Sequence, residues 1–265
     1  MAQYVKVNSD GTKTRVFTEA NATSVASTSS VVTVSNIEEF EAALLAQTAG
    51  QTIVMNPGTY TRTAATKVPL AADGGGIHAL GAVVLNGLST ADACIEIDTA
   101  AATGTFEYTF SGGLEIKGGL NKIGLKAYNG AGTQKTILYF NDSAHAIDNG
   151  TGVAISYVNT GTGAIRLYIN GVGQGFDTIN ITPLLADDRF LFKNICFDET
   201  FTAGAAQVAC YFNFNNCRLS VMAGGHATQV WSAMFCYTQA SGVDSLAAAG
   251  DFTGITCDKL LPVLP

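Results

Sequence analysis

The sequence predicts an all-β chain in which short parallel strands wind into a solenoid beneath one amphipathic helix. Three observations carry this prediction. Short strand candidates separated by Gly, Asn and Thr recur from residue 52 to about residue 220. A six-residue motif returns after 22 residues, a spacing typical of one solenoid coil. The helix pattern precedes all of these strands, at the end where exposed sheet edges need a cap.

Residues 1–30 are polar, and the run from Thr18 to Ser30 consists mostly of Ala, Ser and Thr. Such a composition buries too little apolar surface to form a core of its own. We therefore expect an N-terminal arm over residues 1–30, with a short strand near its start. The arm is either a mobile tail or a segment ordered against a neighbouring subunit.

A helix is predicted over residues 36–49, after the short apolar run Val31–Val34. Ser35 and Glu38 form an S-x-x-E capping box, a common start of a helix. Apolar residues follow at helical spacing, namely Ile37, Phe40 and either Ala43 or Leu44. Gly50 supplies a natural C-cap. Because the apolar face of a helix is normally buried against other apolar residues, we expect the helix to lie over the first strand of the solenoid.

That first strand is Thr52–Met55, and a turn at Asn56-Pro57-Gly58 ends it. Few of the later strand candidates are joined by the Asn-Gly or Asp-Gly links of two-residue hairpins. The candidates are short runs rich in β-branched and aromatic residues: Val68–Leu70, Ala82–Leu85, Cys94–Ile97, Phe106–Phe110, Leu114–Ile116, Ile123–Ala127, Thr136–Phe140, Val153–Val158, Ala164–Ile169, Thr178–Ile181, Phe190–Phe192 and Ala209–Phe214.

The internal repeat aligns Phe192–Phe197 with Phe214–Leu219. It matches Phe with Phe and Asn with Asn. A unit of 22 residues is too short for a domain but suits one coil, with neighbouring coils about 4.8 Å apart in parallel. Asn194 would then lie over Asn216 and form a side-chain amide ladder.

After residue 220 the pattern weakens, although Trp231–Tyr237 and Phe252–Cys257 are further strand candidates. The final LLPVLP is apolar, and its two Pro residues bar it from a central strand. The chain therefore divides into an N-terminal arm (1–30), a β-solenoid domain with its capping helix (31–220), and a C-terminal irregular β region with an extended tail (221–265).

Composition excludes several classes of function. Only 13% of residues are charged, the net charge is −7 and no basic run occurs, so we expect no direct nucleic-acid binding. No run of about 18 apolar residues occurs, so we expect no membrane span. The N-terminus lacks the layout of a signal peptide, and we expect synthesis in a cytosol without export by that route.

The chain has six cysteines: Cys94, Cys196, Cys210, Cys217, Cys236 and Cys257. None belongs to a CxxC pair, and no Cys/His cluster has metal-ligand spacing. We expect reduced, mostly buried thiols, with no metal and no cofactor. A disulfide or a metal site is the alternative.

Several segments resemble the right-handed parallel β-helix of pectin-lyase-like proteins: GQTIVMNPGTY after the helix, then VPL, GAVVLNG, LEIKGG, FKNICF and FNNC. In that family an N-terminal helix caps the solenoid, and a strand ending in a P-G-T-Y turn, here Pro57–Tyr60, opens the first coil. The resemblance covers about residues 31–220. It implies a single-stranded right-handed β-helix with extended terminal arms. It does not imply one activity, because the family includes lyases, hydrolases, adhesins and phage tail proteins.

Carbohydrate-active members of this family use clustered carboxylates, in some cases with calcium and a basic residue. The candidate catalytic residues of such an enzyme are Asp187, Asp188, Asp198 and Glu199. The 22-residue offset places Arg189 near Tyr211 and does not bring Arg218 onto the second acidic pair. We expect both acidic pairs to be solvated corners, and therefore no catalytic site.

Two further patterns bear on binding. Tyr139, Tyr157 and Tyr168 form either an exposed row for carbohydrate or an aromatic stack inside the solenoid, and both alternatives stay open. The three histidines are isolated from one another and are expected at surface or corner positions: His78, His145 and His226.

These features favour a non-enzymatic structural protein of a bacteriophage virion, made in the host cytoplasm. The neutral surface, the polar arm, the apolar tail and the missing export signal all fit a capsid decoration (cement) protein. Its partner would be the major capsid protein or another virion protein. The resemblance implies side-by-side assembly into a homotrimer. The alternative is a tail-fibre or tailspike-type protein that binds a receptor or degrades a polysaccharide, with carbohydrate as its ligand.

Overall fold

The computed structural model describes residues 4–7, 13–16, 30–100, 104–129, 135–171, 175–204, 209–219, 221–224, 229–234, 236–238 and 255–257. Within the expected arm, β1 (Tyr4–Val7) pairs antiparallel with β2 (Lys13–Val16). The rest of the arm before Ser30 and the LLPVLP tail lie outside the described residues.

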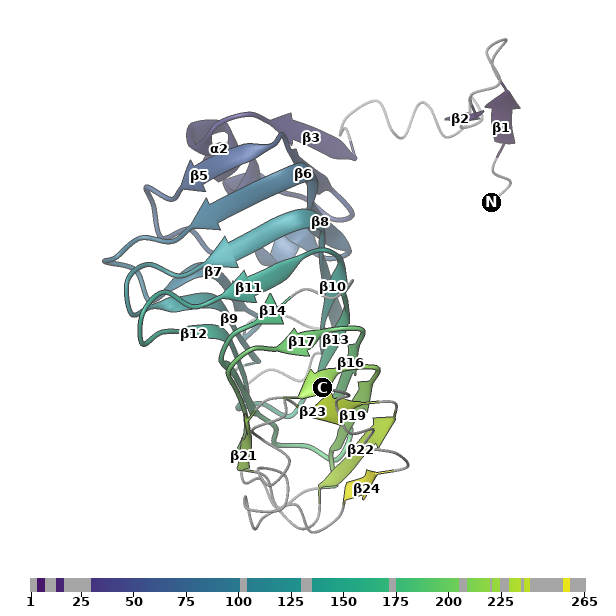
Figure 1. Ribbon diagram of the computed structural model, residues 1–265. Helices are drawn as coiled ribbons and strands as arrows, with labels where there is room; N and C mark the ends of the chain where they lie inside the picture. Colours follow the sequence, from purple (N-terminus) through teal and green to yellow (C-terminus); the bar gives the residue numbers. More distant parts are fainter. Residues whose placement is uncertain are drawn as a thin grey trace.

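The other described strands form three sheets in which every pairing is parallel (Figure 1). The long sheet contains β3 (Val31–Val34), β4 (Thr52–Met55), β6 (Gly75–Asn86), β8 (Thr105–Lys117), β10 (Lys135–Asp142), β13 (Ile165–Gly171), β16 (Arg189–Lys193), β19 (Tyr211–Asn215), β22 (Val230–Met234) and β24 (Ile255–Cys257), with β5 (Gly58–Thr61) and β11 (His145–Ile147) beside β6 and β8. The side sheet contains β7 (Ala93–Asp98), β9 (Ile123–Asn129), β12 (Val153–Asn159), β15 (Ile179–Thr182), β18 (Thr200–Ala203) and β21 (Val221–Gly224). The short sheet contains β14 (Gly175–Phe176), β17 (Cys196–Phe197), β20 (Arg218–Leu219) and β23 (Tyr237–Thr238).

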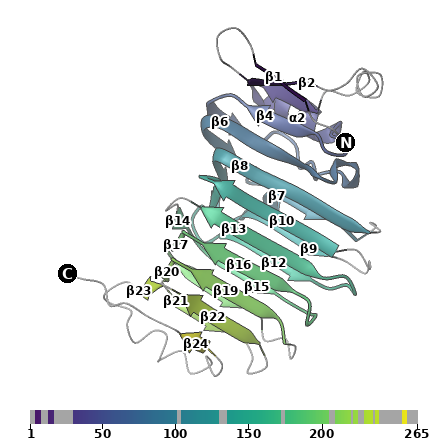
Figure 2. The ribbon, with the colours of Figure 1, turned by 90° about the vertical axis from the view of Figure 1, so that its right-hand side faces the viewer.

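The chain visits these sheets in a fixed order. From β13 to β23 each strand of the long sheet is followed by one of the short sheet and then one of the side sheet. We call one such passage a rung. Strands of successive rungs lie side by side, as the face of the long sheet shows in Figure 2. The predicted all-β, parallel architecture is therefore confirmed.

The rungs stack in register, so equivalent side chains of neighbouring rungs meet. Phe190 pairs with Phe212 and Phe192 with Phe214, which confirms the 22-residue repeat. The rings of these two pairs stack in the core with centroids 4.7 and 5.0 Å apart. Such contacts add roughly 0.5–1.5 kcal/mol per pair beyond the apolar area that they bury.

The predicted amide ladder also exists, and it is one residue longer than expected. Asn216 Nδ2 donates to Asn194 Oδ1 at 2.9 Å, and Asn194 Nδ2 donates to Asn170 Oδ1 at 3.3 Å. Asn194 and Asn216 have φ values of 56° and 53°. Asn tolerates this left-handed conformation better than other residues with a side chain, so it both turns the corner and links the rungs.

Two predictions about the strands need correction. Phe106–Phe110 and Leu114–Ile116 belong to one strand, β8, which is bent at Gly112 (φ 77°). A Cβ atom at Gly112 would lie 2.0 Å from the carbonyl oxygen of Ala79, so only glycine fits there. Val68–Leu70 is not a strand: Val68 makes one isolated bridge and Leu70 begins a 3₁₀ turn, because Pro69 has no N–H for a ladder.

The capping helix α2 runs over Ile37–Leu45, which is shorter than predicted. Its N-cap is Asn36, which accepts a hydrogen bond from Glu39 N, while the Glu39 carboxylate accepts one from Ser35 N. The capping box is therefore shifted by one residue from the expected Ser35–Glu38 pair. Asn competes with Ser for this role because its side-chain oxygen also reaches the first orphan N–H groups.

The helix ends early because Gln47 turns into the core. Its amide donates to the carbonyl oxygens of Gln51 and Gly76, and its Oε1 accepts the hydroxyl proton of Tyr108 at 2.8 Å. Phe40 and Leu44 on the same helix are fully buried against β3 and β4. The predicted lid over the first strands is thus confirmed.

Arg62, just after β5, is buried and joins the lid to the strands. Its Nε donates to Glu41 of α2 at 3.1 Å. Its remaining donors reach the carbonyl oxygens of Ala64, Thr66 and Cys94. A buried charge is tolerated only when it is paired and hydrogen-bonded in this way.

The parallel sheets continue past residue 220. β21 pairs with β18, β22 with β19 and β23 with β20, and β24 adds a further strand to the long sheet. Residues between these strands lie partly outside the described part of the chain.

Replacing Phe40 by alanine tests the lid. Because the ring is fully buried, Phe40→Ala should lower the free energy of unfolding by about 3–5 kcal/mol in urea titrations. Leu45→Ala on the exposed side of the same helix, where the side chain is 71% exposed, should change it by less than about 0.5 kcal/mol. Equal stability of the two variants would contradict the lid.

Candidate functional site

Asp188 is completely buried, contrary to the solvated corner that we expected. Its Oδ1 accepts hydrogen bonds from the amide of Asn159 and from Ile165 N, at 3.0 and 2.8 Å. Its Oδ2 accepts the backbone N–H groups of Leu184 and Leu185 at 2.8 and 2.9 Å. These donors satisfy both carboxyl oxygens and fix the loop before β16, which explains why a polar side chain is found inside the structure. The group is a structural anchor.

Asp187 lies outside, between two arginines. It forms ion pairs with Arg166 at 3.1 Å and with Arg189 at 3.6 Å, so it connects β13 to β16. The guanidinium of Arg189 lies 4.0 Å from the centroid of the Tyr211 ring, as the 22-residue offset predicts. The expectation of a solvent-facing corner is confirmed for Asp187, and also for Asp198 and Glu199 of the second pair, but not for Asp188.

Asp198 forms an ion pair with Arg218 of the next rung. The sequence offset suggested that Arg218 would not reach the second acidic pair, and this was wrong. Cys196 and Arg218 are register partners, and the long arginine side chain extends along its strand to the residue after β17. Glu199 accepts a hydrogen bond from Thr178 Oγ1 at 2.9 Å.

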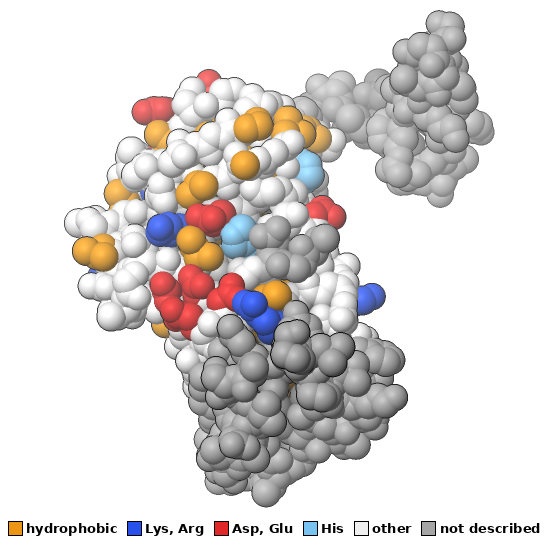
Figure 3. Space-filling view, in the orientation of Figure 1, with side chains coloured by type: hydrophobic (Ala, Val, Ile, Leu, Met, Phe, Trp, Pro, Cys, Tyr) orange, Lys and Arg blue, Asp and Glu red, His pale blue; other side chains and the backbone are white. Residues whose placement is uncertain are grey.

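Two carboxylates that the sequence analysis missed complete an acidic patch. Asp148 follows β11, Asp177 follows β14, and Asp198 and Glu199 follow β17, so all four lie at one corner of successive rungs. Asp148 N donates to Asp177 Oδ2 at 2.9 Å. We call Asp148, Asp177, Asp198 and Glu199 the acidic corner. It faces the viewer in Figure 1, and Figure 3 shows acidic side chains gathered there next to Lys and Arg.

Crowding changes the acidity of this corner. Burial, together with the charges of Glu199 and Asp177, raises the pKa of Asp148 to about 6. Burial and the carboxylates of Glu199 and Asp198 also raise the pKa of Asp177, although its hydrogen bond from Asp148 N acts in the opposite direction. A signal for this cluster exists in the sequence, where each short strand ends in an apolar residue followed by Asp: Ile147-Asp148, Phe176-Asp177 and Phe197-Asp198.

His145 and Glu115 form a neighbouring pair. They are register partners on β11 and β8, and His145 Nε2 lies 3.4 Å from Glu115 Oε2. His145 Nδ1 lies 2.9 Å from the carbonyl oxygen of Ser143. The hydrogen bond from His145 lowers the pKa of Glu115. Burial opposes protonation of His145, but Glu115 and Ser143 outweigh it and raise its pKa. The pair borders a pocket of about 280 Å³ and forms an ion pair when His145 is protonated.

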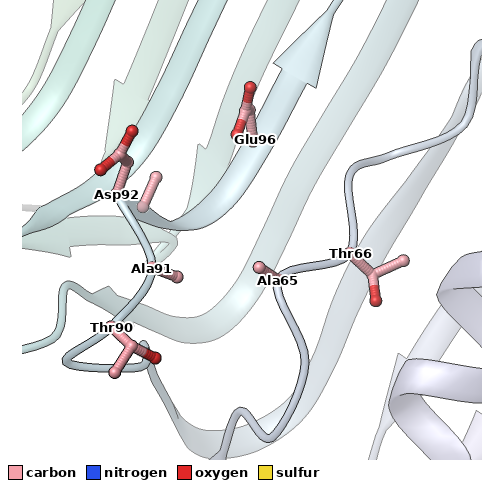
Figure 4. A pocket seen from close by; sticks show the side chains of 7 residues that line it. Ala65, Thr66, Thr90, Ala91, Asp92 and Glu96 are labelled. Carbon is pink, nitrogen blue, oxygen red and sulfur yellow. The ribbon is translucent and has the colours of Figure 1, made fainter.

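A second pocket, of about 290 Å³, lies between the loop that follows β5 and the loop that leads into β7 (Figure 4). Asp92 and Glu96 are its acidic residues, and Ala65, Thr66, Thr90 and Ala91 complete most of its wall. Lys67 beside it forms ion pairs with Glu96 at 2.9 Å and Asp98 at 3.0 Å. Hydrogen bonds with Tyr128, Glu96 and Asp98 raise the pKa of Lys67, so this cluster is charged and internally paired.

The three tyrosines do not form one row. Tyr157 on β12 is fully buried and donates its hydroxyl proton to Thr136 O at 2.9 Å. Tyr139 and Tyr168 are register partners on the outer face of the long sheet, and their rings stack 5.4 Å apart. Tyr157 therefore belongs to the core, whereas Tyr139 and Tyr168 lie on the outer surface.

Within the described residues, no group of three or more His, Cys, Asp and Glu side chains has an arrangement suited to a metal ion. α2, the one α-helix of those residues, is too short to cross a bilayer. The five cysteines whose side chains are described form no disulfide, and four of them are buried: Cys94, Cys210, Cys217 and Cys236.

Comparison of the chain with protein-family models, with curated proteins and with solved structures finds no match.

Asp188→Asn tests whether this carboxylate is an anchor. The variant places an NH₂ group against donors that need an acceptor, so we expect the free energy of unfolding to fall by about 3–5 kcal/mol. Asp187→Asn, which removes two exposed ion pairs one residue away, should cost less than about 1 kcal/mol. Urea unfolding of both variants decides the matter, since similar losses would contradict the anchor.

The acidic corner should make the protein less stable as the pH rises. The folded-state pKa of Asp148, about 6, lies above the ordinary Asp value, so the folded chain binds this proton more tightly than the unfolded chain. The free energy of unfolding should therefore fall between about pH 4 and pH 6 and stay reduced above that range. The corner is partly solvated, so we expect a change of at most about 1 kcal/mol.

Asp148→Asn isolates this effect, because His145 titrates nearby in the same direction. The variant should be more stable than the parent chain at pH 7.5 and equally stable at pH 4. Asp92→Asn, with an Asp that is 74% exposed, serves as the control and should follow the parent at both pH values. A constant difference between Asp148→Asn and the parent would contradict the raised pKa.

Proposed function

We propose that the three sheets form a single-stranded right-handed parallel β-helix. The fixed order of long, short and side sheets supports it, because one chain adds one strand to each sheet per rung. Crossovers between parallel strands of one sheet are right-handed in nearly all proteins, which favours that hand here. α2 at one end then acts as the cap.

We further propose that the protein is a non-enzymatic structural component of a bacteriophage virion, in particular a capsid decoration (cement) protein. The observation that carries this proposal is the outer face of the long sheet. Its central register column consists of Thr109, Tyr139, Tyr168, Leu191 and Asn213, all of them uncharged and at least partly exposed. Charged residues lie in the neighbouring outward columns, among them Glu107, Arg189 and Lys193. A tyrosine-containing, uncharged centre with a charged surround matches the anatomy of a protein interface.

The state of the four candidate acids also favours a structural role. Asp188 is enclosed by donors, Asp187 and Asp198 are paired with arginines, and Glu199 is hydrogen-bonded to Thr178. A general acid or base needs a carboxyl group within reach of a substrate proton. These carboxylates instead hold one rung to the next.

In this proposal the chain is made in the host cytoplasm and forms a homotrimer through the outer face of the long sheet. The arm and the tail contact the major capsid protein or another virion protein. The mechanism is the burial of interface area, which contributes about 25 cal/mol per Å² before the cost of ordering the segments is subtracted. Neither nucleic acid nor a membrane takes part.

A tail-fibre or tailspike-type protein that binds carbohydrate remains the second candidate. The observation that favours it is the stacked pair of Tyr139 and Tyr168, because exposed aromatic rings offer an apolar platform with a polar edge. In that case these tyrosines would contact a sugar, and the same face would stay free of other subunits.

Sedimentation equilibrium separates the two candidates. The full-length chain should have three times the mass of a monomer at micromolar concentration. Tyr168→Lys places a charge in the proposed interface and should shift the protein to monomers. Leu120→Lys at a turn, where Leu120 is 62% exposed, is the matched control and should remain trimeric. A monomeric parent chain would contradict the interface, and binding of capsular polysaccharide that is lost in Tyr168→Lys would support the second candidate.

Immunogold labelling of virions that carry the chain tests its location. Labels spread over the capsid surface are expected for a decoration protein. Labels confined to the tail would support the second candidate, and virions without any label would contradict both.

A further inference from the structure

Two buried cysteines lie on neighbouring rungs at the same position. Cys217 immediately precedes β20, and Cys236 immediately precedes β23. Because Arg218 and Tyr237 are register partners in the parallel pair β20–β23, the two cysteines that precede them are neighbours as well. Both side chains are fully buried, and their thiol groups are in hydrogen-bond contact.

This placement gives the Cα spacing that a disulfide needs. Neighbouring parallel strands lie about 4.8 Å apart, and disulfides join residues whose Cα atoms are about 4.4–6.8 Å apart. Cysteines at one register position also point to the same side of their strands, because side chains alternate along both strands in phase. The two sulfur atoms therefore already face each other in the reduced chain.

We propose that Cys217 and Cys236 form a reversible disulfide that fastens the rung of β23 to the rung of β20. The oxidant is a small disulfide such as oxidised glutathione. One cysteine thiolate attacks it and releases one reduced thiol, and the second cysteine thiolate then displaces the other. In total the two cysteines lose two electrons and two protons, and the small disulfide takes them up as two thiols.

The surroundings determine when the reaction occurs. The hydrogen bond with Cys236 and burial raise the pKa of Cys217, so its reactive thiolate is rare in the closed structure. β23 is the last strand of the short sheet among the described residues, and terminal strands open locally more easily than inner ones. Oxidation therefore requires a brief opening of this end, and the disulfide then holds the end closed.

The test uses the full-length chain, incubated under native conditions with oxidised glutathione and then blocked, digested and analysed by mass spectrometry. We expect two of the six thiols to disappear and a peptide pair linked through Cys217 and Cys236, with the chain about 2 Da lighter. Limited proteolysis after β20 should slow by at least about tenfold, and reductant should reverse the effect.

Cys210→Ser is the matched control, since Cys210 is also buried, and it should oxidise like the parent. Cys217→Ser and Cys236→Ser should each form no intramolecular disulfide and show no protection against proteolysis. If the variants fail to fold, the peptide map of the parent chain still decides the question. A different linkage, or six thiols that persist although the peptide bonds near β23 are cleaved, would overturn the proposal.

Discussion

Parallel stacking in register is the constraint on which the rest of this structure depends. Side chains lie beside their equivalents on the next rung, so the side chains of one register column must pack or bond favourably with one another. Phenylalanines satisfy this rule inside, where Phe192 stacks on Phe214. Amides satisfy it at a corner, where Asn194 bonds to Asn216, because an amide is both donor and acceptor.

Carboxylates do not stack favourably, because like charges on neighbouring rungs repel each other. This explains how the charged residues of the chain are arranged. Asp177 and Asp198 lie at equivalent corners of successive rungs and repel each other. The chain compensates by pairing Asp198 with Arg218 and Asp187 with Arg166 and Arg189. Asp188 escapes the repulsion through burial among backbone donors. The residues of the candidate site are therefore the positions at which charged side chains are accommodated in a stack of repeating rungs.

The sequence was sufficient for the features that depend on local pattern. The parallel β architecture, the lid residues Phe40 and Leu44, and the register of Phe192 over Phe214 all follow from periodicity and repeat length. The two-residue strands of the short sheet have no such period, so β14 and β17 were not anticipated. For the same reason the acidic corner was missed, because its members come together only when these strands are placed.

Contacts that depend on how far a side chain extends could not be predicted from the sequence either. An offset of 22 residues aligns the backbones of two rungs. It does not show that the Arg218 side chain, whose register partner is Cys196, reaches Asp198 two residues further along the neighbouring rung. Nor does it tell that the donors around Asp188 come from Asn159 and Ile165 on other strands. Burial of a carboxylate depends on such distant partners, and local composition carries no trace of them.

The equal spacing of the rungs has a consequence for how such a molecule changes in size. β16 to β18 and β19 to β21 are equivalent units, and each contacts only the units on either side. Duplication of one unit lengthens the molecule by one strand spacing, about 4.8 Å, and leaves all other contacts as they were. The length of the molecule can therefore change during evolution by whole units, while the residues at its two ends stay the same.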